Sequence, residues 1–136
     1  MPRLFRESPL NAIWEGSGNV QCLDALKAAQ RSPETLAAVF DELDLARSSD
    51  RRFDSALDAL QEELMVQDGL EFRARRVVER LALALQASLL LRYAPNEVSE
   101  AFLRSRLLGE HGQAFGTLPA EIDFKRIIER SQPVSC

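Results

Sequence analysis

The residues best suited to chemistry lie in one short stretch, N-A-I-W-E-G-S-G-N-V-Q, residues 11–21. Glu15 follows the bulky apolar pair Ile13 and Trp14, and the glycines after it let a ligand or another backbone approach closely. Burial of a carboxylate against an aromatic ring raises its pKa toward neutrality, as a general base requires. Glu15 is therefore a candidate catalytic base.

The glycines of this stretch allow other interpretations. Gly16 and Gly18 precede a predicted helix, whose first N–H groups and positive dipole end suit an anion. No predicted strand precedes them and the G-x-G-x-x-G spacing is absent, which excludes a dinucleotide-binding fingerprint. Gly-Ser-Gly is also a common flexible helix entry, with Ser17 or Asn19 as the cap, and an isolated glutamate is most often a solvated surface group.

A longer stretch of sequence favours one of these interpretations of Glu15 and the glycines. R-L-F-R-E-S-P-L-N-A-I-W-E-G-S-G-N-V-Q-C-L-D, residues 3–24, resembles the late active-site segment of acyl-CoA dehydrogenases, and more narrowly their alkylation-response (AidB-like) branch. The closing run G-T-L-P-A-E-I-D-F-K-R-I-I-E-R, residues 116–130, resembles the C-terminus of the same branch. The resemblance implies that Glu15 removes the α-proton of an acyl-CoA thioester while hydride passes to FAD. It places Gly16 directly after that base, and Ser17 and Asn19 among the contacts to FAD.

The position of the motif departs from the family. Its members carry several hundred residues ahead of this glutamate, which form the acyl and flavin cleft, whereas Met1 stands close before Glu15. The resemblance thus implies the C-terminal portion of a flavoenzyme, inactive alone, whose partners are the missing flavin and acyl-CoA domains and further copies of the chain. We expect residues 1–30 to end the dehydrogenase-like segment and residues 31–136 to form a C-terminal helical domain.

Composition indicates an ordinary soluble globular protein, with 46% hydrophobic and 28% charged residues. The longest apolar run, residues 81–91, is too short to span a bilayer, and no signal-peptide pattern is visible. These features predict a cytoplasmic protein without membrane contact. A single histidine, His111, and two distant cysteines, Cys22 and Cys136, lack the spacing of zinc ligands, so no metal site is expected.

The hydrophobic periodicity predicts an all-α fold, a bundle of about five to six helices after an irregular lead-in over residues 1–16. Ser32 is expected to cap the second helix, with Pro33 in its first position. The fourth is expected at the centre, packed on several sides, because its second half is apolar nearly all round. Phe124, Ile127 and Ile128 of the last helix are expected to clasp the bundle. The predicted helices begin at residues 19, 33, 50, 70, either 95 or 96, and either 120 or 123.

A short stripe of basic residues suggests a second possible function. Arg73, Arg76 and Arg80 fall on one face of the predicted fourth helix, and Arg104 and Arg106 lie near the end of the fifth. In the AidB-like branch the C-terminal helical domain is associated with double-stranded DNA, so the resemblance makes these five arginines candidate DNA contacts.

The overall charge argues against DNA binding. The chain has a net charge of −4, and residues 31–70 hold four basic and ten acidic groups. Binding driven by phosphates favours a concentrated positive field. The arginines could instead pair with Glu71, Glu79 and Glu100 as surface ion pairs. A third hypothesis is a self-associating domain that dimerises through the apolar lead-in, including Phe5, Ile13 and Trp14.

Overall fold

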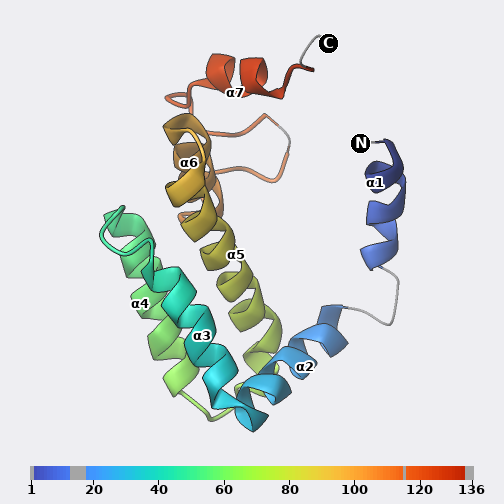
Figure 1. Cartoon of the computed structure of the whole chain (residues 1–136), viewed down its shortest axis with the longest axis vertical. Helices are drawn as coiled ribbons and strands as arrows, with labels where there is room; N and C mark the ends of the chain where they lie inside the picture. The colour runs from blue at the N-terminus through green and yellow to red at the C-terminus, as the bar shows by residue number, and fades with distance from the viewer. Residues whose placement is uncertain (1, 13–17, 115, 134–136) are drawn as a thin grey trace.

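The computed structural model describes residues 2–12, 18–114 and 116–133, and in that part the chain is helical with no strand, which confirms the all-α prediction. None of the described helices is long and apolar enough to cross a membrane. The α-helices are α1 Pro2–Glu7, α2 Gly18–Arg31, α3 Pro33–Asp44, α4 Arg51–Met65, α5 Ala74–Tyr93, α6 Asn96–Phe102 and α7 Phe124–Ser131 (Figure 1). Three further segments are short 3₁₀ or π helices, η1 Ser8–Ala12, η2 Glu71–Arg73 and η3 Leu103–Leu107.

Helix starts follow local side-chain chemistry. Asp50 caps α4 by accepting from the Arg52 N–H at 2.8 Å, and Asp123 caps α7 by accepting from the Arg126 N–H at 3.1 Å. Ser32 is the N-cap residue of α3, as predicted, although its side chain makes no cap hydrogen bond. Pro33 takes the first helical position, where its fixed φ and missing N–H cost nothing.

Helix α5 lies at the centre of the bundle, as predicted. It contacts α2, α3, α4, α6 and η3, and Figure 1 shows α3 and α4 along one side with α2 at its foot. Packing of these elements excludes water from one apolar core, which supplies the main stabilisation of the fold. The core side chains are Leu26, Leu43, Ala46, Phe53, Leu57, Leu60, Leu70, Ala74, Val77, Ala84, Ala87 and Leu103.

Helix α5 packs on several sides, as predicted, but one side of it is open. Leu85, Leu89 and Tyr93 are spaced four apart and are 36%, 41% and 73% exposed. Residues at this spacing share a helix face. The described bundle therefore leaves part of the apolar surface of α5 uncovered.

The two ends of the chain also differ from expectation. The lead-in is helical over its described residues because Pro2 occupies a first helical position, which proline favours, and a 3₁₀ turn follows from Ser8. Figure 1 shows α1 standing away from the bundle. The predicted apolar clasp at the other end forms only in part, since Ile127 is half-buried whereas Phe124 and Ile128 are 41% and 57% exposed. An ion pair from Arg126 to a carboxylate of α6 also ties α7 to the bundle.

The predicted fifth helix changes type after Phe102. The Leu108 N–H donates to the Leu103 carbonyl five residues earlier at 3.0 Å, the spacing of a π-helix. Gly109 then takes a positive φ of 68°, which ends the helix. The wider turn rotates the side chains of its arginines relative to an uninterrupted α-helix.

Candidate functional site

The dehydrogenase-like motif falls largely outside the described residues. Glu15, Gly16 and Ser17, the predicted base and two of its neighbours, lie in the part that the structure does not describe. Asn19 is described and exposed, but α2 begins at Gly18, so Asn19 lies inside the first turn and is not the cap. A polar residue at a helix N-terminus is compatible with an anionic cofactor such as FAD. Asn19 alone does not make a cofactor site.

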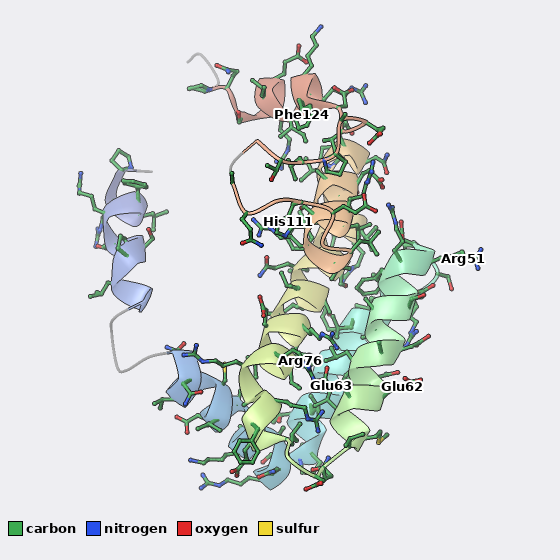
Figure 2. The ribbon with its side chains drawn as sticks, turned by 180° about the vertical axis from the view of Figure 1, so that it is seen from behind. Arg51, Glu62, Glu63, Arg76, His111 and Phe124 are labelled. Carbon is green, nitrogen blue, oxygen red and sulfur yellow. The ribbon has the colours of Figure 1, made fainter. Side chains whose placement is uncertain are left out.

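The predicted basic stripe converges on one carboxylate, Glu63 of α4. Arg76 donates to Glu63 Oε1 from Nε at 2.9 Å and from Nη2 at 2.5 Å. Arg80 donates from Nη1 to Oε2 at 2.6 Å, and Arg73 Nη1 lies 3.5 Å from Oε1. Figure 2 shows Glu63 and Arg76 turned toward each other between α4 and α5. Arg73 at the end of η2 and Arg76 and Arg80 on α5 thus share one acceptor.

The arginines alter the acidity of Glu63. Its side chain is 8% exposed, and desolvation by this burial raises the pKa of the carboxyl. Hydrogen bonds from Arg76 and the charges of Arg80 and Arg76 outweigh that effect, so the pKa of Glu63 lies below its ordinary value. Glu63 is consequently a carboxylate at neutral pH.

Arg73 has a structural role beside this cluster. Its guanidinium donates to the carbonyl oxygens of Glu63 at 3.2 Å, Val66 at 2.5 Å and Asp68 at 3.2 Å. These carbonyls lie at and beyond the end of α4, where helical acceptors lack partners within the helix. Arg73 thereby closes the C-terminus of α4 against the start of α5.

The two remaining arginines lie on the π-helix η3 and differ in their surroundings. Arg104 donates to Glu110 at 2.5 Å and to Glu121 at 3.1 Å. These hydrogen bonds raise the pKa of Arg104. Both glutamates belong to the connector between η3 and α7, residues 108–123, so the pairs tether this connector to η3. Arg106 is exposed and borders a groove.

That groove, which we call the arginine groove, lies between α4, α5 and η3 and has a volume of about 400 Å³. Its polar wall consists of Arg76, Glu79, Arg80 and Arg106. It can therefore offer three guanidiniums to an anion above an apolar surface. The apolar lining is formed by Ala56, Ala59, Leu83, Ala84 and Leu107.

The tertiary structure thus brings Arg76, Arg80 and Arg106 together, although they come from two predicted helices. The alternative in which these arginines pair with Glu71, Glu79 and Glu100 names the wrong partners for the ion pairs that the structure describes. Glu100 pairs with Arg52 on α4. Glu63 pairs with Arg76 and Arg80 on α5. Sequence reasoning missed Glu63 because a pair 13 or 17 residues apart requires knowing which helices pack together.

Metal binding receives no support from the described residues, where no group of three or more histidine, cysteine, aspartate or glutamate side chains is placed to hold an ion. His111 is exposed, with Nδ1 2.7 Å from the Gly112 carbonyl oxygen. That contact is local to the connector.

Comparison with known proteins identifies a relative over most of the chain. The chain matches no family model, and no solved structure matches it. It is 36% identical over 111 residues to the acyl-CoA dehydrogenase-like protein AidB of Escherichia coli (strain K12). The matched segment makes up 79% of this chain and 19% of AidB, so the chain spans about one fifth of that protein. Over this shared segment, the chain is an AidB-like relative of the acyl-CoA dehydrogenases.

Proposed function

We propose that this chain serves as the C-terminal helical part of an acyl-CoA dehydrogenase-like flavoprotein and is inactive by itself. The similarity to AidB, limited to 19% of that protein's length, carries the proposal. In the complete enzyme Glu15 would take the α-proton of the acyl-CoA thioester, and bound FAD would supply the hydride-accepting chemistry. Gly16, Ser17 and Asn19 contribute to the FAD environment, and the protein acts in the cytoplasm.

The apolar surface of the chain supports a role in packing against other domains or further copies. Leu4 and Phe5 on α1 are 66% and 78% exposed, and the open side of α5 adds Leu85 and Leu89. Large contiguous apolar patches on soluble proteins mark interaction surfaces. In the isolated chain the same patches favour self-association.

The test of inactivity is a dye-reduction assay on the purified chain, with FAD and acyl-CoA thioesters of several lengths. We expect no reduction above the rate without protein, because a base without an assembled acyl and flavin cleft cannot position the reacting atoms. Glu15→Gln is the control variant. Turnover by the chain that disappears in Glu15→Gln would overturn the proposal.

A second candidate function is an interaction with double-stranded DNA. The observation that favours it is the arginine groove, in which Arg76, Arg80 and Arg106 gather although the chain as a whole is acidic. Phosphate binding depends on such local concentration of positive charge as well as on net charge. Arg73 and Arg104 contribute to the same field, although each also holds a structural contact.

Fluorescence anisotropy of a short labelled duplex, at low and near-physiological salt, tests this candidate. We expect binding that weakens steeply with salt and a slope lowered by about one for each contact removed, as in Arg80→Ala or Arg106→Ala. Arg51→Ala is the matched control, because Arg51 is exposed at the far end of α4 from Glu63 (Figure 2). Flat titrations at both salts would eliminate the DNA interaction.

A further inference from the structure

The arginine groove holds more positive charge than its carboxylates neutralise. Arg76, Arg80 and Arg106 line it, and Arg73 joins the first two at Glu63. Against these four guanidiniums stand Glu63 and Glu79, which leaves an excess of two positive charges. An uncompensated excess of this kind attracts anions to a recess with apolar walls.

The guanidiniums of Arg76 and Arg80 are accessible to solvent, although the carboxylate of Glu63 is not. The side chains of Arg76 and Arg80 are 57% and 50% exposed, whereas that of Glu63 is 8% exposed. Glu63 therefore lies beneath the arginines, whose side chains line the groove. An incoming anion reaches the arginines without first displacing the glutamate from its place.

Arg80 is the guanidinium most readily released. One hydrogen bond of 2.6 Å joins it to Glu63, whereas Arg76 makes two and Arg73 is also held by the backbone at the end of α4. Breaking one charge-assisted bond costs less than breaking two. Arg80 can therefore turn into the groove while Glu63 keeps the other two arginines.

The π-helix provides a second, independent feature. Arg106 comes from η3, and π-turns are uncommon and occur frequently at functional sites. Leu107 beside it contributes to the apolar wall. The irregular turn thus supplies one guanidinium and one apolar side to the same recess.

We propose that the arginine groove binds a phosphate group by exchange, with Glu63 as the internal anion that holds Arg80 until the phosphate replaces it. In the bound form Arg80 and Arg106 donate to the phosphate oxygens, and Glu63 keeps Arg73 and Arg76. The identity of the ligand as duplex DNA rests on the second function proposed above. The exchange itself concerns any phosphate.

Removing the charge of Glu63 tests the exchange. Glu63→Gln preserves shape and one acceptor oxygen but frees Arg80, so binding of the duplex should tighten by at least about threefold. Glu62→Gln is the matched control, since it changes the net charge equally at an exposed neighbour that points away from the groove in Figure 2. The gain should disappear when Arg80→Ala is added to Glu63→Gln.

The experiment has two arms, anisotropy with the duplex and the thermal unfolding midpoint in inorganic phosphate compared with chloride at equal ionic strength. Tighter binding or larger phosphate stabilisation in Glu63→Gln than in Glu62→Gln supports the exchange. Equal gains in the two glutamine variants overturn it. If phosphate stabilises Glu63→Gln more than Glu62→Gln but neither variant binds the duplex, the exchange is supported and DNA is rejected as the ligand. If the duplex binds with an affinity that Glu63→Gln does not change, DNA binding is supported and the exchange is rejected.

Folding of the variants is checked by circular dichroism. If Glu63→Gln does not fold, Arg80→Ala and Arg106→Ala decide the matter, because both retain Glu63. Each must reduce the phosphate stabilisation relative to Arg51→Ala. A reduction no larger than that of Arg51→Ala would overturn the proposal.

Discussion

Replacement of Phe53 by alanine is expected to lower the free energy of unfolding by about 3–5 kcal/mol, the largest loss from truncating any one of the described side chains. Phe53 is 0% exposed and lies in the first turn of α4, in the same core as Leu43 and Leu57. Truncation removes its apolar contacts and leaves a cavity, because the surrounding helices relax only partly. Domains of this size have a total stability of roughly 5–15 kcal/mol, so the variant should be close to unfolding at elevated temperature.

Urea unfolding followed by circular dichroism measures this loss. Phe72→Ala is the matched control, because Phe72 is 98% exposed in η2 and has the same chemistry. Its stability should change by less than about 0.5 kcal/mol, as for most surface substitutions. Similar losses for the two variants would show that Phe53 is not in the core described here.

Substitution of Arg52 by methionine should lower the free energy of unfolding by roughly 1–3 kcal/mol at neutral pH. Arg52 donates to both carboxylate oxygens of Glu100 on α6, at 2.9 and 2.5 Å, and to Asp50 at 3.0 and 2.6 Å. It therefore joins the start of α4 to a helix 48 residues away. Its side chain is 31% exposed, which keeps the loss below that of a fully buried pair.

The same variant should show a weaker pH dependence. The hydrogen bonds from Arg52 hold the pKa values of Asp50 and Glu100 below their ordinary range. In the folded state these carboxyls bind fewer protons than in the unfolded state, so their contribution is present above that ordinary range and is lost as pH falls through the lowered values. Arg52→Met removes this part of the acid-induced loss.

Urea titrations at pH 7 and at acid pH measure both effects. Arg51→Met is the control, because Arg51 is its exposed neighbour in the sequence and carries the same charge. It should unfold like the original chain at each pH. An acid-induced loss in Arg52→Met as large as in the original chain would contradict the assigned ion pairs.

Local physical chemistry explains the accuracy of the helix predictions. Asp50, Pro33, Pro95 and Gly109 mark helix ends through hydrogen bonding or backbone restriction that involves only near neighbours. The apolar period of 3.6 residues gave the all-α class and the central place of α5, since a helix face must be buried against another element. The resemblance of residues 3–24 pointed to the relative that the comparison also identified.

Packing decided what the sequence could not. The partner of Arg76 and Arg80 is Glu63 because α4 lies against α5, a relation absent from the spacing within either helix. The exposure of Leu85 and Leu89 likewise depends on which side of α5 the other helices leave open. Apolar periodicity predicts which face of a helix must be buried. Only the arrangement of the helices in space determines which element buries that face.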